Sequence, residues 1–129
     1  IRHLDHLVFT VKDIPATIEF YARVLNMQVI QFGDTDDNPP RFALKFGNQK
    51  INLHEADNEF KPKAQNATPG SADLCLITET DLEQAMTYVQ NCNVEIIEGP
   101  VKRTGAQGDL LSFYIRDPDL NLIEISNQT

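Results

Sequence analysis

The sequence predicts an α+β fold in which two tandem βαβββ modules form a paired, curved, mixed sheet. Three observations predict it: a strand-like alternation of apolar and polar residues opens each half, a helical pattern follows, and further strand-like segments close each half. The 129 residues are enough for one domain, or for two small modules that share a core. We therefore predict a single domain over 1–129, with modules at 1–56 and 71–129 and a linker at 57–70.

The first module begins with a half-buried strand at Leu4–Val11, where apolar residues alternate with polar ones. A helix is predicted next, because Asp13 is a favourable N-cap residue and Pro15 suits a first helical turn. Three more strands complete this module, at Gln28–Phe32, Phe42–Phe46 and Ile51–His54, with the turn Gly47-Asn48 between the last two.

The second module repeats this order of elements. It opens with a strand at Asp73–Thr78, followed by a helix at Asp81–Gln90 with Thr80 as a possible cap. The remaining elements are a strand at Val94–Ile97, a loop at Gly99–Gly108, and strands at Leu110–Ile115 and Leu122–Ile125.

An internal duplication accounts for this repetition. A shift of 67 residues places His6 on Asp73, and a shift of 70 places His54 on Glu124. Few residues are identical between the halves, so the shared order of elements is the stronger indication. Two such units placed side by side could enclose a pocket.

Charge and cysteine content restrict the partners and the compartment. The net charge of −8 disfavours nucleic acid and anionic membranes. No apolar run approaches the ~18 residues of a membrane helix. Cys75 and Cys92 have no CxxC spacing and fit a reducing compartment. We expect a cytoplasmic protein that acts on a small molecule and binds neither nucleic acid nor membranes.

Four side chains with metal-binding groups alternate against apolar neighbours in the predicted strands: His6, His54, Asp73 and Glu124. Each therefore points away from the face that the helix covers. Singly, such residues are more often solvated or hydrogen-bonded in a core. Together, two imidazoles and two carboxylates at duplicated positions suit a divalent first-row metal ion. Asn52 shares the face of His54.

Several segments resemble the vicinal oxygen chelate superfamily over nearly the whole chain. LDHLVFTV and DIPATIEFYARVLNMQV are similar to its opening, and FYIRDPDLNLIEI to its closing signature. The superfamily includes glyoxalase I, extradiol dioxygenases, fosfomycin-resistance enzymes, methylmalonyl-CoA epimerase and bleomycin-binding proteins. KINLHEA, PGSADLCLITE and GPVKRTGAQG resemble the lactoylglutathione-lyase-like group of glyoxalase-domain-containing protein 5.

The resemblance implies roles for the four candidate ligands. His6 matches the ligand on the first strand of the family, and Glu124 matches the carboxylate ligand on the last strand. His54 lies where glyoxalase I has a glutamate, or one alternation from it, and Asp73 stands where most active members have histidine. The ion expected is Ni²⁺, Mn²⁺, Fe²⁺, Zn²⁺ or Mg²⁺. Homodimers, which are common in the superfamily, are expected here.

The shared mechanism of the superfamily implies the catalytic groups. A metal ion binds two neighbouring substrate oxygens, and a carboxylate near it removes the proton α to the carbonyl. Glu124 is the first candidate for this base and Asp73 the second. The predicted loop at 99–108 could cover the pocket, or be a solvated hairpin tip. The candidates for substrate binding are Lys102, Arg103, Tyr114 and Asn52.

Three functions remain open at this point. The first is a metal-dependent lyase or isomerase of glyoxalase I type, acting on a small α-oxo compound or its thiol adduct. The second is an Fe²⁺ or Mn²⁺ extradiol-type dioxygenase, which would use His6, His54 and Glu124 as a two-His-one-carboxylate set. The third is a non-catalytic protein that binds a small molecule, as bleomycin-resistance proteins do.

Overall fold

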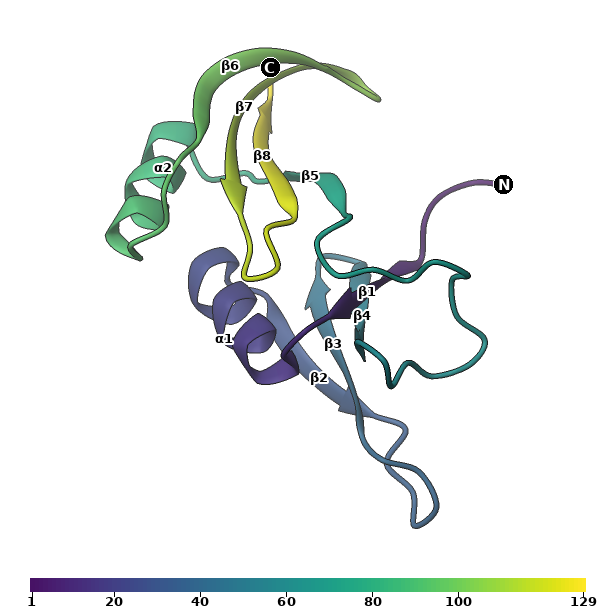
Figure 1. Cartoon of the computed structure of the whole chain (residues 1–129). Coiled ribbons are helices and arrows are strands. Elements are labelled where there is room, and N and C mark those ends of the chain that lie inside the picture. The colour runs from purple at the N-terminus through teal and green to yellow at the C-terminus, as the bar shows by residue number, and fades with distance from the viewer. The chain divides into compact units, whose positions relative to one another are not determined.

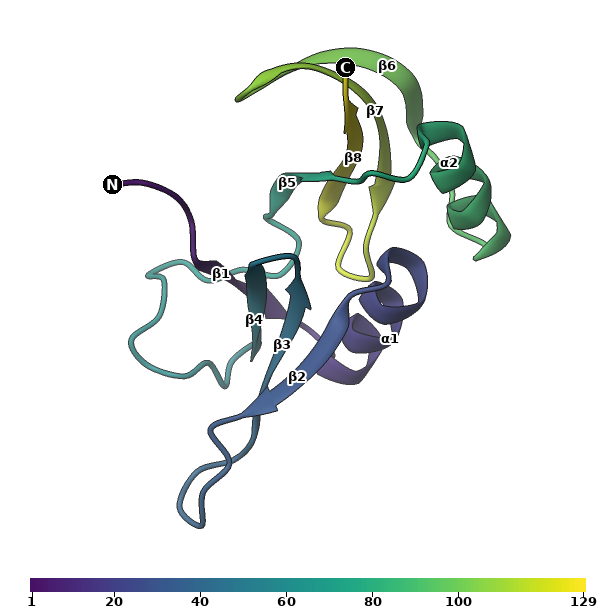
Figure 2. The same cartoon turned by 180° about the vertical axis from the view of Figure 1, so that it is seen from behind.

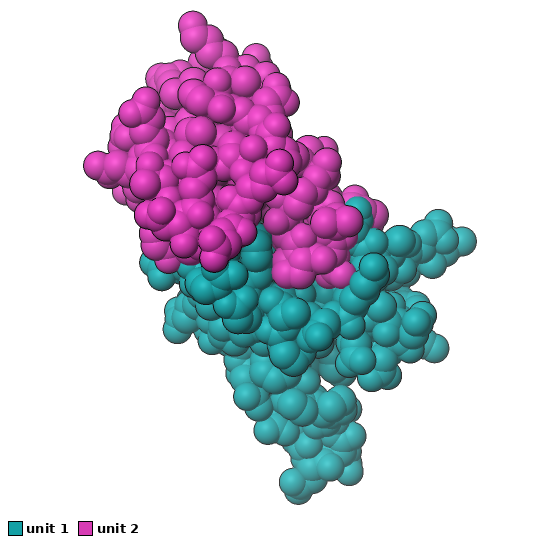
Figure 3. All heavy atoms as spheres, turned by 60° about the vertical axis from the view of Figure 1, so that its left-hand side comes forward, with its two compact units in different colours: residues 1–70 teal, residues 71–129 magenta.

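A computed structural model describes residues 1–129. The chain divides by contacts into unit 1, residues 1–70, and unit 2, residues 71–129 (Figure 3). Each unit contains one strand, one helix and three more strands, so the predicted tandem βαβββ order is confirmed. The elements are β1 His6–Val11, α1 Ile14–Leu25, β2 Gln28–Phe32, β3 Arg41–Phe46, β4 Gln49–Glu55, β5 Asp73–Ile77, α2 Leu82–Asn91, β6 Glu98–Gly105, β7 Gly108–Arg116 and β8 Leu122–Gln128.

The two sheets have the same topology. The strand order is β1-β4-β3-β2 in unit 1 and β5-β8-β7-β6 in unit 2 (Figure 1). In each sheet the opening strand pairs in parallel with the closing strand, and the other pairs are antiparallel. The view from behind shows β1 beside β4 (Figure 2). The first and last strands of each unit are therefore neighbours, which places their side chains on one sheet face.

Helix α1 begins and ends where its sequence provides caps. The side chain of Asp13 accepts a hydrogen bond from the backbone N–H of Ala16 at 3.1 Å, which stabilises the helix by about 1 kcal/mol. Asn26 ends it in the left-handed conformation, with φ 54°. The helix buries Phe20 and Tyr21 against the apolar face of the unit 1 sheet.

Helix α2 begins one residue later than the sequence indicated. Asp81 is its N-cap, and its side chain accepts from the backbone N–H of Gln84 at 3.4 Å, so the expected cap at Thr80 is wrong. Leu82 and Val89 are the buried residues of this helix. The unit 2 core also contains the fully buried Phe113.

The segment before β7 differs from the sequence prediction. Residues 94–97 form no strand, and most of the predicted loop at 99–108 is β6, which pairs with β7. The sequence did not predict this strand, because Gly99 and Pro100 are residues that usually interrupt strands. They fit because β6 is an edge strand whose register shifts between Glu98 and Val101. A Cβ at Gly99 would lie 2.6 Å from Cβ of Phe113, so this position requires glycine.

A buried turn positions β8. Oδ1 of Asp117 accepts hydrogen bonds from the backbone N–H groups of Asp119 and Asn121, both at 2.9 Å. The Asn121 side chain donates to Asp117 Oδ2 at 2.8 Å and accepts from the Ala72 backbone at 2.8 Å. This turn therefore links the start of β8 to the residue before β5.

Two further observations concern the chain as a whole. Residues 57–70, predicted as a linker, group with unit 1 by their contacts. Neither helix has the length and apolar character that crossing a membrane requires.

Candidate functional site

In unit 1, the two predicted histidines lie on the sheet face that α1 does not cover. Phe9 on β1 contacts Tyr21 of α1, with ring centroids 6.3 Å apart. Because strand side chains alternate, His6 lies on the opposite face. His54 on β4 pairs with Thr10, which also lies on that face. The alternation predicted from the sequence is therefore confirmed in unit 1.

Unit 2 repeats this arrangement with two carboxylates. Leu74 pairs with the fully buried Ile123, while Cys75 pairs with Glu124. Asp73 is two residues from Cys75 and lies on the same face. Asp73 and Glu124 thus occupy neighbouring strands on the face opposite Ile123.

The strand register separates the histidines but keeps the carboxylates near each other. His6 opens β1, whereas Thr10, the partner of His54, lies four positions further along, or about 13 Å. Asp73 and Glu124 differ by two positions on adjacent strands, or about 8 Å between their Cα atoms. Within its own unit, only the carboxylate pair is thus close enough to act together.

The register also corrects the internal duplication. The residue that pairs with the third position of the opening strand is Asn52 in unit 1 and Glu124 in unit 2. Asn52 therefore corresponds to Glu124, with a shift of 72 residues, and His54 corresponds to Ser126. The shift of 70 that placed His54 on Glu124 is wrong, because comparing sequences without gaps cannot show how a closing strand pairs across a helix.

Two buried serines hold the carboxylate of Glu124. Ser112 Oγ donates to Glu124 Oε2 at 2.7 Å, and Ser126 Oγ donates to the same oxygen at 3.2 Å. The two serine hydroxyls lie 2.7 Å apart, and both residues are fully buried. Cys75 Sγ lies 3.2 Å from Ser126 Oγ, and burial raises the pKa of the Cys75 thiol. Glu124 is thus fixed through Oε2, while Oε1 accepts no hydrogen bond from either serine.

Tyr114 and Arg103 lie beside Glu124. Tyr114 pairs with Glu124 across β7 and β8, and Arg103 Nε donates to the Tyr114 hydroxyl at 2.9 Å. Burial raises the pKa of Tyr114, and the neighbouring Glu124 carboxylate raises it further. Arg103 also lies 3.3 Å from Glu98 Oε1, so this guanidinium already has an acidic partner.

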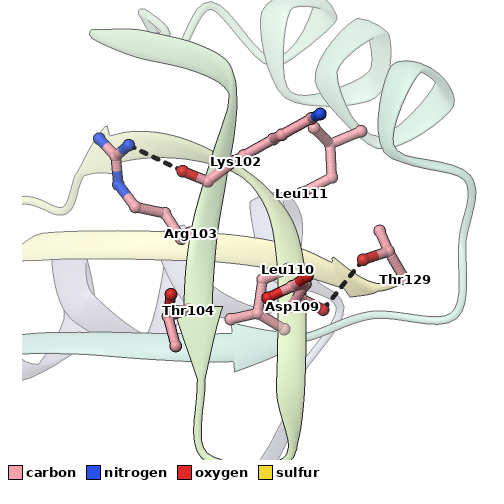
Figure 4. A pocket seen from close by; sticks show the side chains of 7 residues that line it. All are labelled: Lys102, Arg103, Thr104, Asp109, Leu110, Leu111 and Thr129. Atoms are coloured by element: carbon pink, nitrogen blue, oxygen red, sulfur yellow. Dashed lines mark hydrogen bonds between the residues drawn. The ribbon is translucent and has the colours of Figure 1, made fainter.

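Lys102, the other predicted basic contact, lies on the opposite face of β6 from Arg103. It pairs with Leu111, whereas Arg103 pairs with Leu110. The two side chains leave β6 in opposite directions (Figure 4). Both line an open cavity of about 570 Å³ near the β6–β7 turn, to which Glu124 and Tyr114 do not contribute. The structure therefore does not bring Lys102 near the carboxylates.

Asp5 orients His6. Nδ1 of His6 lies 2.8 Å from Oδ2 of Asp5, and this hydrogen bond lowers the pKa of Asp5. A carboxylate that accepts from Nδ1 favours the tautomer whose Nε2 carries a free lone pair. The His6 side chain is 43% exposed, so a ligand can reach it.

His54 has different surroundings, because it is buried among a cation and an aromatic ring. Its Nε2 lies 3.4 Å from Nη2 of Arg41, and its ring contacts Phe60 edge-on at 5.5 Å. Burial lowers the pKa of His54, and the charge of Arg41 lowers it further. A neutral His54 whose Nε2 faces a guanidinium is poorly placed to bind a second cation.

No group of three or more His, Cys, Asp or Glu side chains forms a metal site in this structure. The fit of an ion is therefore judged from the candidate ligands one at a time. His6 and Glu124 each have a hydrogen-bond partner that orients them. Asp73 pairs with Leu122 through the backbone ladder, and it is exposed. Asp73 and Glu124 in unit 2 and His6 in unit 1 are thus the remaining candidate ligands, whereas the contact of His54 with Arg41 does not suit a cation.

The comparisons with known proteins agree with this fold. The profile of the Glyoxalase/Bleomycin resistance protein/Dioxygenase superfamily matches residues 3–125. The chain belongs to this superfamily. It is 52% identical over 126 residues to virulence protein STM3117 of Salmonella typhimurium, covering 98% of this chain and 84% of that protein. It is 51% identical over 127 residues to glyoxalase domain-containing protein RDO1 of Mycosarcoma maydis, covering 98% of this chain and 69% of that protein.

Solved structures show the same relationship. An integron cassette protein from V. cholerae is 60% identical with a TM-score of 0.94, over 100% of this chain and 97% of that one. More distant members share the fold alone. They include lactoylglutathione lyase from Agrobacterium tumefaciens, which is 18% identical with a TM-score of 0.70, over 98% of this chain and 94% of that one. FosX from Listeria monocytogenes is a fosfomycin resistance protein solved with Mn(II) and a dihydroxypropylphosphonic acid. It is 21% identical to this chain with a TM-score of 0.66, over 100% of this chain and 92% of that one.

Sequence reasoning missed several residues of these sites. Asp5 could have been found, because it adjoins His6. Ser126 could also have been found, because it shares the alternation of Glu124. Arg41 gave no signal, since its contact with His54 depends on how β3 and β4 pair.

Proposed function

We propose that this protein is a metal-dependent lyase or isomerase of glyoxalase I type that acts on a small α-oxo compound or its thiol adduct. The observation that carries this proposal is the carboxylate of Glu124. Two buried serines fix its Oε2, and Asp73 lies beside it on the neighbouring strand. Membership of the superfamily supports the same class of chemistry.

Glu124, through Oε1, and Asp73 would hold the ion on the sheet of unit 2, and His6 stays a predicted ligand through its Nε2. The hydrogen bond that Asp5 accepts from His6 and the one that Ser112 donates to Glu124 are of the kind that orients metal ligands. One imidazole and two carboxylates suit Mn²⁺, Fe²⁺, Ni²⁺ or Zn²⁺, and Mg²⁺ where oxygen ligands dominate. When bound, the ion would polarise the substrate oxygens and stabilise negative charge that develops on them.

The protein's own part in the reaction is to move a proton. In a hemithioacetal, the base takes the proton from the carbon that bears sulfur and returns it to the neighbouring carbonyl carbon, while the hydroxyl proton on the first carbon moves to the oxygen of the second. The product is the thioester of a 2-hydroxy acid, and the conversion needs no oxidant or reductant. We assign this base to Glu124, with Asp73 as the second candidate. The serines keep Oε2 of Glu124 in place while Oε1 exchanges the proton.

The surroundings of His54 disfavour the dioxygenase alternative. A two-His-one-carboxylate set would need His54 beside His6 and Glu124. However, Nε2 of His54 faces Arg41. A lyase that uses the carboxylates fits these contacts better than an iron dioxygenase does.

Turnover by the purified chain tests the proposed function. The protein is stripped with EDTA and reloaded separately with Ni²⁺, Mn²⁺, Zn²⁺, Fe²⁺ or Mg²⁺. It is then given the hemithioacetal of methylglyoxal and glutathione, and thioester formation is followed by absorbance. We expect turnover with at least one ion and none without metal. No turnover with any ion would reject the lyase and favour a binding protein, while oxygen uptake with catechols would restore the dioxygenase.

The assembly and location of the protein stay predictions. Sedimentation in solution would test the expected homodimer. Fractionation of expressing cells would test the expected cytoplasmic location.

A further inference from the structure

The face of the unit 1 sheet that α1 does not cover, called the uncovered face below, is positively charged, although the whole chain carries a net charge of −8. Arg41, Lys45 and Lys50 lie on this face, because they pair with or alternate beside residues on the same side as Asn52. No Asp or Glu on β1, β2, β3 or β4 occupies the same face. Such a local excess of cations attracts anionic ligands.

Arg41 is held in place without an acidic partner. Its Cζ lies 4.4 Å from the ring centroid of Phe60 and 5.4 Å from that of Phe32. Gly33 leaves room for its stem, since a Cβ there would lie 3.1 Å from Arg41 Cδ. Because two aromatic rings restrict the guanidinium, little side-chain freedom remains to be lost when a ligand binds.

The guanidinium of Arg41 keeps free donors. Its Nη2 lies 3.4 Å from His54 Nε2, and the Arg41 side chain has no other hydrogen bond. The acid near His54 is Glu59, whose carboxylate lies 3.1 Å from Nζ of Lys63. Since arginine has five N–H donors in a planar fork, most remain available for a carboxylate or phosphonate group. Lys50, whose Nζ lies 4.3 Å from the Phe32 ring centroid, adds a second cation.

A buried acceptor lies on the same sheet face as Arg41. Asn52 is 7% exposed, and its Oδ1 has no hydrogen-bond partner. It pairs with Ala43, which is two residues from Arg41 along β3. A buried amide oxygen needs a donor or a cation, and most such groups in folded proteins have one. A hydroxyl group of a ligand would supply this donor.

We infer that the uncovered face of the unit 1 sheet binds a small hydroxylated anion, with its carboxylate or phosphonate on Arg41 and its hydroxyl on Asn52. This inference rests on the proposed function only in taking the bound molecule to be the substrate or product. It deepens that function, because it assigns an anionic group to the compound that is converted.

Binding of defined probes to the metal-free protein tests this inference. Protein in EDTA is titrated calorimetrically with glycolate and with hydroxymethylphosphonate. Acetate and methylphosphonate are the matched probes without a hydroxyl, and ethylene glycol is the probe without an anion. We expect the hydroxylated anions to bind most tightly, the plain anions more weakly, and ethylene glycol not at all. Equal binding of hydroxylated and plain anions would remove Asn52 from the site.

Two variants separate a built site from general charge attraction. Arg41→Gln should lower the affinity for both hydroxylated probes by about tenfold or more, because the variant loses the charged guanidinium that can donate two hydrogen bonds to one anion. Lys45→Gln removes one positive charge from the same face of the same strand and should change affinity less than about twofold. Equal losses in the two variants, or no loss in Arg41→Gln, would overturn the inference.

Two more variants keep the test decisive. If Arg41→Gln does not fold, Arg41→Lys replaces it, since it keeps the charge but lacks the fork, and undiminished affinity would overturn the inference. Asn52→Leu should bind the hydroxylated probes no more tightly than it binds acetate and methylphosphonate. Because these titrations contain no metal, a failure here leaves the turnover result standing, and a lack of turnover leaves the binding result standing.

Discussion

Unit 1 and unit 2 have one strand topology, yet their equivalent positions carry different functional groups. The position that holds Glu124 in unit 2 holds Asn52 in unit 1. Ser126, which donates to Glu124, corresponds to His54, which lies against Arg41. The two proposals above assign a cation to the carboxylates of unit 2 and an anion to Arg41 of unit 1. The difference teaches that a duplicated fold can carry different ligand-binding groups at equivalent positions.

The largest effect is expected at Glu124. Replacing it with Gln removes the proposed base and should lower turnover by about 10²–10⁴-fold, measured as kcat with the hemithioacetal. Asp109→Asn is the matched control, since Asp109 is an exposed carboxylate of the same unit. Anion binding to the unit 1 face should not change. Near-normal turnover in Glu124→Gln would place the base elsewhere.

Removing the support behind Glu124 should have the next largest effect. Ser112→Ala deletes the 2.7 Å hydrogen bond to Oε2, so the affinity for Mn²⁺ should fall by about 10–100-fold in calorimetry. Ser112 is a positioning residue, and the affinity for glycolate at Arg41 should stay the same. A parallel loss of both affinities would mean that the substitution disturbs the fold and not this carboxylate.

A gain of stability is expected at Asn52. Its buried Oδ1 has no partner in the free protein, so Asn52→Leu should raise the free energy of unfolding by about 1 kcal/mol in urea. Saturating glycolate should narrow this difference, because only the native residue would then gain a partner. A variant less stable than the native protein would indicate that the Asn52 amide contributes to the fold.

The smallest effect concerns pH. The pKa of His54 lies below its ordinary value of 6.5, so the unfolded chain binds this proton more readily than the folded chain. Folding stability should therefore decrease as pH falls below 6.5. Urea unfolding at pH 7.5 and pH 5.5 should show a smaller decrease in His54→Gln, and His3→Gln, an exposed histidine, serves as the control. An unchanged pH dependence in His54→Gln would mean that its buried contact with Arg41 does not matter for stability.

The sequence was sufficient for the order of elements and for the faces of the strands. Alternation has a fixed period of two, so the shared face of Asp73 and Glu124 followed from residue patterns alone. The position along a strand did not follow, because the pairing of β1 with β4 crosses a helix and two strands. His54 therefore looked equivalent to Glu124 until the register placed Asn52 there.

Long-range contacts were the other limit. Arg41 contacts His54 and Phe60 only through tertiary packing, and no local sequence pattern predicts these contacts. Gly99-Pro100 in β6 led to the prediction of a loop, since these residues usually interrupt strands. Lys102 and Arg103 consequently lie on a strand, where alternation sends them to opposite faces.

The position of a bound metal ion tests the division between the two units most directly. Crystals soaked in Mn²⁺ together with hydroxymethylphosphonate would locate the ion by its anomalous scattering and the anion by its density. We expect Mn²⁺ at Glu124 and Asp73, and the phosphonate on Arg41. Mn²⁺ bound through His54, or the phosphonate seated on Arg103, would contradict the assignment of cation and anion to separate halves.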